Sequence, residues 1–477
     1  MFSTNLLRRK CCTSFSLLLG TIVVLGFSSS QFFVALASAG SKVEYIPGFQ
    51  HEGPLPFELE TGYVGVGKSE DVQLFYYFVK SESNPSIDPI VLWISGGPGC
   101  SSFFALAEEL GPLTFDVPKN NLTLPTLSLN PYSWTKVASF IYLDLPVGTG
   151  FSYAKSFKNY TSNSIETSYH AAEFLRKWLA DHFEYQSNSF YVGGDSFSGM
   201  TVPTVVQAIS YGIEARLKPL VNLKGYLIGN GFTFRMDHLD YLLRSARGFG
   251  IIPDELYQSI EECGGGTAPD MNYGLICQFK VGIFLVLSDI NFGQNFLETN
   301  CYLQEENGVS SEQSSVAKRF RGFAVRALDR YFVCNGPKVS SRWANDGSVQ
   351  EALHVRKGTI EEWEQCREDL PYHKTVFDSR PYHAILSQKG YRSLIYNGDG
   401  DLYVPSLSAE AWTKAMKYPI IDDWRPWFIN NQVVGYTRTF SNNMTYAKIK
   451  GSAHIAPTVT PLECLVMFKR WISYEKL

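Results

Sequence analysis

The chain has 477 residues, of which 45% are hydrophobic, and its formal net charge is −4. This length allows two or three domains, or one large α/β domain with an insertion, and it supplies enough apolar side chains for a sizeable core. The weakly acidic balance gives no reason to expect nucleic acid or an anionic membrane as a partner.

The first 39 residues have the layout of a secretory signal peptide. Basic residues at 8–10 precede an apolar run at 15–27, and Ala37-Ser38-Ala39 forms a small-residue cleavage site. We expect cleavage after Ala39, which removes three of the 42 basic residues and none of the 46 acidic ones, so that the mature net charge is −7. An uncleaved membrane anchor is the alternative, but the apolar run is shorter than the ~20 residues that a span needs. We therefore expect a secretory protein that is not bound to a membrane after cleavage.

The cysteine pattern agrees with an oxidising compartment. Of nine cysteines, Cys11 and Cys12 fall in the leader, and the other seven include no C-x-x-C pair, so we expect disulfides rather than a zinc site. Seven is odd, and Cys464 is the expected free thiol because it lies in the apolar run 462–468. Three N-x-S/T sequons are candidate glycan sites, at Asn121, Asn159 and Asn443.

Strand and helix patterns alternate along the mature chain. The expected strands are 72–79, 89–94, 140–145, 189–192, 226–228, 392–396 and 445–449. Three helices are expected. One has an apolar stripe at 171–179, one starts near 202–206 with Pro203 in its first turn, and a closing helix covers 461–474. This βαβ rhythm predicts an α/β fold, with a mostly parallel sheet and helices on both faces.

The rhythm breaks between residues 234 and 342. This segment holds four of the seven mature cysteines and helical patterns at 238–247 and 278–287. We interpret it as an inserted, disulfide-bonded helical cap. The expected core is therefore made of two parts, 40–233 and 343–477.

Ser196 has the sequence surroundings of a catalytic nucleophile. It lies between small residues on an expected strand-to-helix turn, the position of a nucleophile elbow, where glycines are needed because bulky neighbours would collide with the strand and the helix. The strict pattern is G-x-S-x-G, and here Gly194 matches it while Ser198 stands where the second glycine is usual, with Gly199 one place later.

A serine nucleophile needs an imidazole to accept its proton and a carboxylate to orient that imidazole. In this kind of fold the acid and the histidine follow the serine in the chain, each on a loop after a strand. Asp399 and Asp401 both follow the strand that ends at Tyr396, and His454 follows the strand that ends at Ile449. The pattern alone leaves the choice between the two aspartates open.

A glycine-rich loop follows the strand 89–94. Such a loop supplies one backbone N–H for the oxyanion of an acyl-transfer intermediate, and the residue after the nucleophile, Phe197, supplies the other. A phosphate-binding loop is the competing interpretation, but there is no G-K-[ST] and Pro98 lacks a donor.

Four stretches together resemble the serine carboxypeptidase family. They are the loop 96–102 (GGPGCSS), the runs 130–134 (NPYSW) and 146–153 (PVGTGFSY), and the elbow 194–199 (GDSFSG). The likeness runs from about Val43 to the C-terminus. It implies an α/β-hydrolase fold with a cap, and it implies roles for particular residues.

The implied triad is Ser196, Asp401 and His454, because the family uses the second acid of its G-D-x-D loop. The implied oxyanion donors are the amides of Gly97 and Phe197. The implied disulfides are Cys100–Cys366, Cys263–Cys277 and Cys301–Cys334. The chemistry of the family needs no metal or other cofactor.

The chain departs from the peptidases of the family at two positions. Those enzymes usually carry Asn where Ser95 stands and Glu where Asp195 stands, and with a Glu that matches Glu109 these groups hold the terminal carboxylate of a peptide. Each replacement is shorter, and serine has no amide donor, so the carboxylate clamp should be weaker. The expected substrate contacts are Ser95, Gly96, Glu109 and Asp195.

These departures resemble the plant acyltransferase branch of the family, as do residues 422–427 and 435–439. The resemblance implies that the partners are two small molecules, an acyl donor that is a 1-O-β-glucose ester and an acceptor with a hydroxyl or amine. The branch is often vacuolar, whereas the leader itself indicates only the secretory pathway, so we expect a vacuolar or extracellular location. The oligomeric state is not indicated. A serine carboxypeptidase is the alternative, and a third hypothesis is a binding protein without catalysis on a hydrolase scaffold.

Overall fold

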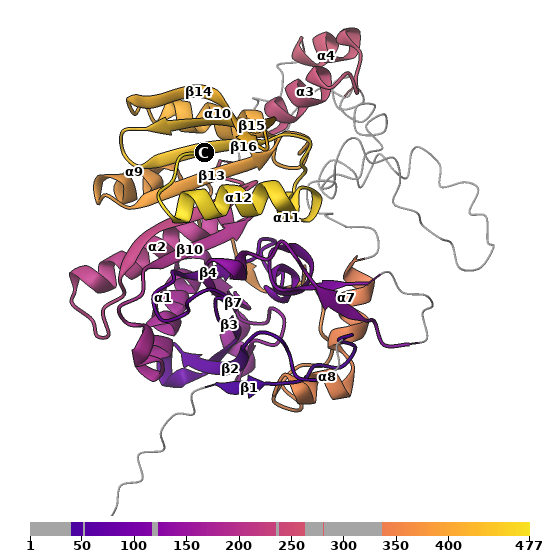
Figure 1. Ribbon diagram of the computed structural model, residues 1–477, viewed down its shortest axis with the longest axis vertical. Helices are drawn as coiled ribbons and strands as arrows, with labels where there is room; N and C mark the ends of the chain where they lie inside the picture. The colour runs from indigo at the N-terminus through magenta and orange to yellow at the C-terminus, as the bar shows by residue number, and fades with distance from the viewer. Residues whose placement is uncertain (1–39, 51–52, 117–122, 235–237, 263–279, 281–335) are drawn as a thin grey trace, which may run out of the picture. The chain divides into compact units, whose positions relative to one another are not determined.

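The computed structural model describes residues 40–50, 53–116, 123–234, 238–262, 280 and 336–477 (Figure 1). Several predicted features lie outside these residues: the signal peptide at 1–39, the sequon at Asn121, the helical pattern at 278–287 apart from residue 280, and the disulfides Cys263–Cys277 and Cys301–Cys334.

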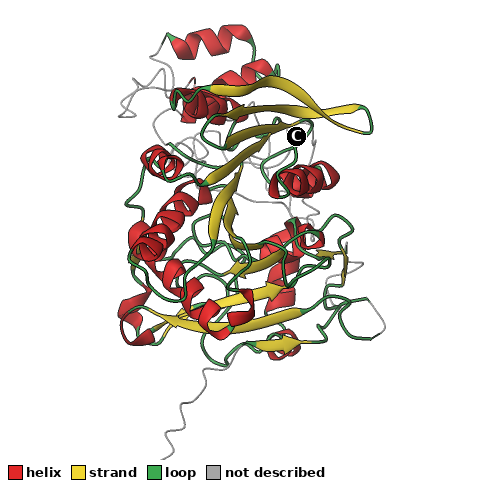
Figure 2. Cartoon of the chain, turned by 60° about the vertical axis from the view of Figure 1, so that its left-hand side comes forward, coloured by secondary structure: helices red, strands yellow, loops and turns green. Residues whose placement is uncertain are grey.

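The described residues form a large sheet whose order is β1-β2-β3-β7-β4-β10-β11-β13-β16-β15-β14, with β8 paired to β3 (Figure 2). Its strands are β1 (Ser41–Val43), β2 (Leu59–Val66), β3 (Val72–Val79), β4 (Ile90–Ile94), β7 (Ser139–Leu143), β8 (Tyr153–Ala154), β10 (Phe190–Asp195), β11 (Leu223–Gly229), β13 (Arg392–Gly398), β14 (Ile420–Ile429), β15 (Gln432–Phe440) and β16 (Met444–Ile449). The central run from β7 to β16 is parallel, and the strands outside it pair antiparallel. The predicted mostly parallel α/β sheet is therefore confirmed.

Two short pairs lie off this sheet: β5 (Leu113–Phe115) with β6 (Leu127–Leu129), and β9 (Ser162–Asn163) with β12 (Tyr372–His373). The helices are α1 (Ser164–Asp181), α2 (Ser198–Glu214), α3 (His238–Gly248), α4 (Asp254–Glu261), α7 (Gly336–Ala344), α8 (Gly347–Ala352), α9 (Arg380–Gln388), α10 (Ser406–Ala415), α11 (Ala456–Val459) and α12 (Pro461–Ile472). None of these helices combines the length and the apolar character needed to cross a membrane.

The sheet is covered on both faces, and alternate residues of one strand point to opposite sides. In β4, Val91 and Trp93 join one apolar cluster, while Ile90, Leu92 and Ile94 join the other. The first cluster includes α12, and the second includes α1 and α2. A strand buried on both faces is apolar at every position, which is why the run 89–94 was recognisable from sequence.

The described part of the predicted cap contains two helices. The expected helix at 238–247 is α3, and it packs with α4 through a small apolar cluster that also includes Leu402, next to Asp401. The predicted C-terminal boundary of the cap, at residue 342, falls inside α7.

Pro203 is not in the first turn of its helix. Helix α2 begins at Ser198, so the proline lies within it and cannot donate to the carbonyl of Gly199. The hydroxyl of Ser379 donates to that carbonyl instead, at 2.7 Å. A side chain distant in sequence thus replaces the missing backbone hydrogen bond and lets the helix start earlier than its proline suggests.

The cysteines and sequons among the described residues are placed as follows. Cys100 and Cys366 form the predicted disulfide, and Cys464 is a buried free thiol, as predicted. Asn443 is exposed, whereas Asn159 is half-buried and its amide donates to Asp71. Of these two sequons, Asn443 is the more accessible to a glycan.

A partly buried ion pair ties the end of α1 to the outer strands. His182, directly after α1, lies 2.9 Å from Glu60 of β2, whose carboxylate also accepts a hydrogen bond from Tyr76 of β3 at 2.6 Å. Burial favours the neutral form of both partners, but their mutual hydrogen bond and opposite charges outweigh it, so the pKa of His182 is raised and the pKa of Glu60 is lowered.

We predict that this pair stabilises the fold most in mildly acidic solution. A raised histidine pKa contributes stability below the ordinary value of 6.5 and loses it as the pH rises through the folded-state pKa, whereas the lowered Glu60 pKa contributes above 4.5. His182→Gln should therefore lower the melting temperature more at about pH 5.5 than at about pH 8.5. In a Glu60→Gln background the same substitution should lose this pH dependence, and an equal loss at both pH values would contradict the assignment.

Candidate active site

Ser196 sits on a strained turn between β10 and α2. Its φ is +53°, a value that non-glycine residues seldom adopt, and the turn leaves no room for side chains on its neighbours. A Cβ on Gly194 would lie 2.3 Å from the carbonyl oxygen of Ile94, and one on Gly199 would lie 2.6 Å from that of Phe232. The turn therefore has the geometry expected of a nucleophile elbow.

Ser198, which stands where the elbow pattern usually has glycine, is buried and donates to the carbonyl oxygen of Ile94 at 2.8 Å. Its side chain joins the start of α2 to β4. Serine in place of the usual glycine therefore supplies a hydrogen bond that fixes the start of α2 to β4.

The structure brings Ser196, His454 and Asp401 together in one chain of hydrogen bonds. His454 Nε2 lies 2.9 Å from Ser196 Oγ, and His454 Nδ1 lies 2.8 Å from Asp401 Oδ2. With the proton on Nδ1, the imidazole donates to the carboxylate and accepts from the serine hydroxyl. This is the arrangement in which histidine can act as a general base toward serine.

The two candidate aspartates have different partners. Asp401 is fully buried, and its Oδ1 accepts from the amides of Tyr403 at 2.7 Å and Val404 at 2.9 Å, while its Oδ2 faces His454. Asp399 instead accepts from the amide of Gly451 at 2.8 Å. Asp401 is therefore the acid that contacts the histidine, as the family resemblance implied.

A fourth residue, Asn230, holds the carboxylate of Asp401 and was not predicted. It is fully buried with a φ of +46°, and its side-chain amide donates to Asp401 Oδ2 at 2.7 Å and to the carbonyl of Ala453 at 3.1 Å. Asn230 thus links the acid to the backbone beside His454. Its sequence signal is an asparagine between two glycines directly after a strand, a pattern shared with many ordinary turns.

The glycine loop lies directly against the elbow. A Cβ on Gly96 would lie 2.7 Å from Ser196 Cβ and 3.0 Å from the backbone nitrogen of Phe197, so only glycine fits there. The N–H groups of Gly97 and Phe197 donate to no acceptor among the described residues. Both predicted donors are therefore available to an oxyanion that forms at Ser196.

The glycine loop is fixed from two sides. On one side, the Cys100–Cys366 disulfide is flanked by backbone hydrogen bonds from Ser101 to Gln365 at 2.8 Å and from Arg367 to Gly99 at 2.9 Å. This pairing holds the loop against the segment around Cys366.

On the other side, the buried carboxyl group of Asp144 accepts from the Ser101 hydroxyl at 2.6 Å and from the amides of Ser102 and Phe151, each at 3.0 Å. Burial raises the pKa of Asp144 to about 7, although these donors act to lower it. Asp144 was not singled out from sequence.

The predicted substrate contacts form an acidic cluster beside the triad, made of Ser95, Glu109 and Asp195. All three are buried, and Asp195 accepts from the amide of Gly96 at 3.2 Å. Burial raises the pKa of Asp195 and of Glu109, and the proximity of Asp195 raises that of Glu109 further. Neither Ser95 Oγ nor Glu109 Oε2 has a hydrogen-bond partner among the described residues.

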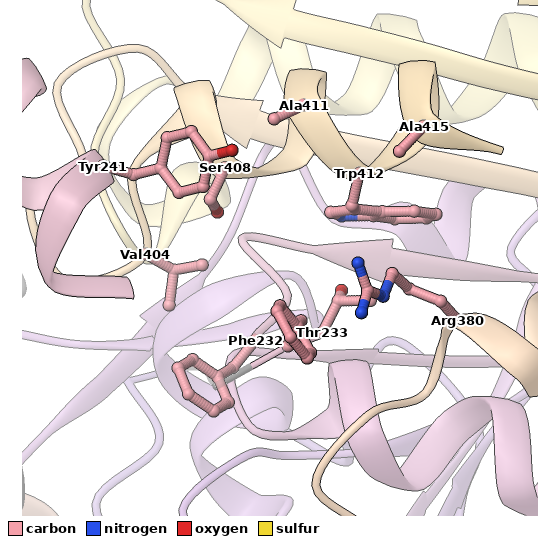
Figure 3. A pocket seen from close by; sticks show the side chains of 10 residues that line it. Phe232, Thr233, Tyr241, Arg380, Val404, Ser408, Ala411, Trp412 and Ala415 are labelled. Carbon is pink, nitrogen blue, oxygen red and sulfur yellow. The ribbon is translucent and has the colours of Figure 1, made fainter. Parts of the chain in front are cut away.

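A separate cavity of about 80 Å³ is lined by side chains of α3 and α10 and of the segments that hold Thr233 and Val404 (Figure 3). Val404, Tyr241 and Trp412 line it together with Arg380, whose guanidinium pairs with Asp378 at 2.8 Å. No triad residue lines this cavity. Within the part of the chain that the structure describes, no cluster of three histidine, cysteine or acidic side chains could hold a metal ion.

Comparison with known proteins gives a consistent result. The family model described as serine carboxypeptidase matches residues 47–474. Serine carboxypeptidase-like 19 of Arabidopsis thaliana is 43% identical over 96% of this chain and 99% of its own length. Serine carboxypeptidase-like 7 of the same plant is 44% identical over 95% and 98%.

Among solved structures, the prohormone-processing carboxypeptidase Kex1Δp of Saccharomyces cerevisiae has a TM-score of 0.70 at 19% identity, and the match covers 91% of this chain and 95% of that one. This likeness establishes the fold. The predicted α/β-hydrolase fold is thus confirmed, and its sheet carries a serine, histidine and acid in hydrogen-bond contact. The chain belongs to the serine carboxypeptidase family.

We predict that Asn230 positions the acid of the triad. Because its φ is positive, Asn230→Gly removes the side chain without backbone strain. The loss of a hydrogen bond to a charged group should lower kcat for an ester substrate about 10- to 100-fold and change KM little. The control is Asn222→Gly, since the Asn222 side chain donates only to Ser187 in an exposed turn. A change in KM alone would contradict this role.

Proposed function

We propose that this protein is an acyltransferase that moves an acyl group from a 1-O-β-glucose ester to a small-molecule acceptor. The proposal rests on membership of the serine carboxypeptidase family, on the contact between Ser196 and His454, and on the composition of the acidic cluster. Its reaction has two steps that use the same residues.

In the first step, His454 Nε2 takes the proton of Ser196 as Oγ attacks the ester carbonyl of the donor. The oxyanion that forms accepts hydrogen bonds from the amides of Gly97 and Phe197. The bond to the sugar oxygen then breaks, glucose leaves with the proton from His454, and the acyl group stays on Ser196 as an ester. Asp401 keeps the imidazole in position throughout.

In the second step, an acceptor hydroxyl or amine takes the place that glucose has left. It gives its proton to His454 and attacks the acyl-serine carbonyl, and the Ser196 oxygen leaves with that proton. Hydrolysis differs only in that water is the second nucleophile. The balance therefore depends on how well the site binds the acceptor and excludes water.

The acidic cluster is the observation that carries the choice of donor. A peptide carboxylate needs hydrogen-bond donors, but Ser95 offers a single hydroxyl, and Asp195 already accepts from the loop amide of Gly96. Glucose is neutral and rich in hydroxyl donors. The unpartnered oxygen of Glu109 and the hydroxyl of Ser95 suit such a group better than they suit a second carboxylate.

A serine carboxypeptidase remains the second candidate, and one observation favours it. The pKa values of Asp195 and Glu109 are raised, so in acidic solution these groups carry protons and can donate to a peptide carboxylate. For either activity we propose a vacuolar or extracellular location, which the leader sequence supports.

Purified mature protein incubated with an acyl-glucose and a mixture of plant hydroxyl and amine metabolites should form acyl esters or amides, whereas a blocked dipeptide should be cleaved slowly or not at all. Ser196→Ala should lower acyl transfer about a thousandfold or more. Mass spectrometry would detect products and the acyl-serine intermediate. Peptide cleavage without acyl transfer would refute the choice, and failure of a fluorophosphonate to label Ser196 would favour a non-catalytic binding protein.

The acidic cluster predicts how the activity can be redirected. Ser95→Asn adds an amide donor and Asp195→Glu lengthens the acid, so the double variant should bind a peptide carboxylate more tightly. We expect a lower KM for a blocked dipeptide and a higher KM for the acyl-glucose. Matched dipeptide and dipeptide-amide substrates provide the control, because only the former carries the carboxylate. No gain for the dipeptide would mean that these residues do not face the leaving group.

A further inference from the structure

Helices α1 and α2 leave an apolar groove at the end of α2 that is far from the nucleophile. The groove has a volume of about 220 Å³, and buried small and branched residues, Ala172, Ala208, Ile209 and Val221, form its inner surface. Its wall residues on α2 begin ten positions after Ser198, about 15 Å along the helix axis at the α-helical rise. The groove is therefore distinct from the site around Ser196.

The walls of the groove are aromatic and partly exposed. Tyr169 of α1 and Tyr211 of α2 are about half exposed, at 53% and 45%, and so is Leu217, at 47%. Exposed apolar side chains that converge on a concavity are unfavourable in water unless something covers them. Lys389 Nζ lies over the Tyr211 ring, 4.8 Å from its centre, so the surface left for a flat apolar group is that of Tyr169, Leu217 and the uncovered part of Tyr211.

Gly212 gives the groove part of its depth. It lies inside α2 with ordinary helical angles, where glycine is less stable than alanine by about 1 kcal/mol. A Cβ at this position would meet only the side chain of Leu217, at 3.8 Å, so packing does not require glycine. The absence of a side chain at Gly212 leaves the space over this part of α2 open, and this space is part of the groove.

Arg176 supplies a positive charge at the groove. Glu173 also lines the groove, but its carboxylate is already occupied, because it pairs with Lys177 at 3.0 Å and accepts from the amide of Gly67 at 3.0 Å. Within the described ranges, no carboxylate lies within ion-pair distance of Arg176. An apolar concavity with one unneutralised guanidinium is complementary to an amphipathic anion.

We propose that this groove is a second ligand site, which binds a small aromatic carboxylic acid. The size favours one ring with a short side chain, since an apolar cavity of ~150 Å³ is enough to bind benzene. The ring lies against the apolar surface between the helices, and the carboxylate pairs with Arg176. This site goes beyond the proposed acyl transfer, because it involves neither Ser196 nor the acidic cluster.

The test uses trans-cinnamate as the probe and calorimetry on the mature protein. We expect cinnamate to bind at least about tenfold more tightly than the neutral cinnamamide, and Arg176→Gln to remove that difference. Arg216→Gln is the matched control, because Arg216 is an exposed arginine nearby that does not line the groove. It should change the affinity less than about twofold.

Two substitutions at Gly212 separate filling of the groove from loss of the fold. Gly212→Ala adds only the Cβ and should keep cinnamate binding, whereas Gly212→Leu should weaken it at least about tenfold by occupying the space. Melting temperatures would verify that both variants fold. Equal affinity for all variants would place cinnamate elsewhere, and an effect of Arg176→Gln without an effect of Gly212→Leu would mean that the groove itself is not used. Either result, or no binding, overturns the proposal.

The test of the groove can be distinguished from the test of the proposed acyl transfer. Ser196→Ala should bind cinnamate at the groove as the wild type does, whether or not the wild type transfers acyl groups. If transfer fails and groove binding survives, only the proposed function is wrong. If binding is lost in Ser196→Ala, the probe occupies the active site and the groove proposal is wrong.

Discussion

The strained backbone at Ser196 is the constraint on which the rest of the site depends. A φ of +53° persists only if the surroundings fix it, and hydrogen bonds do so on both sides. The amide of Ser196 donates to the carbonyl of Gly229 at 2.9 Å, and its carbonyl accepts from Phe232 at 2.8 Å. The short segment from Gly229 to Phe232 also carries Asn230, which holds Asp401. One segment therefore fixes both the nucleophile and the acid.

Parallel strands explain how residues so far apart in sequence meet. Strands β4, β10, β11, β13 and β16 are neighbours, and each is followed at its carboxyl end by a part of the site. In sheet order these parts are the glycine loop at 96–97, Ser196, Asn230, Asp401 and His454. Because the strands point the same way, their loops lie along one edge of the sheet. The sheet provides the rigid support, and the loops provide the chemistry.

The sequence was sufficient to predict a site residue where its residue type and its position after a strand together indicated one chemical role. Ser196, His454 and the glycine loop were predicted on that basis, and the buried strands were recognisable because they are apolar throughout. Asn230 and Asp144 were missed because a polar residue after a strand is typical of many turns, and only the folded chain shows which ones reach the site. Strands β14 and β15 were missed because an edge hairpin with charged residues and Pro426 lacks the apolar pattern of a central strand.

In the acidic cluster, contacts within the protein do not offset the free-energy cost of burying the carboxyl groups. No lysine or arginine among the described residues contributes to the pKa of Glu109 or Asp195. The proximity of His454 lowers the pKa of Asp195, whereas Glu109 has no compensating cation among these residues. Such burial destabilises the ionised forms, and neither Glu109 Oε2 nor Ser95 Oγ has a hydrogen-bond partner in the part of the chain that the structure describes. A bound molecule with hydroxyl groups would satisfy both atoms without adding charge. This cost is the physical basis of the proposal that the cluster favours a neutral, hydroxyl-rich leaving group over a carboxylate.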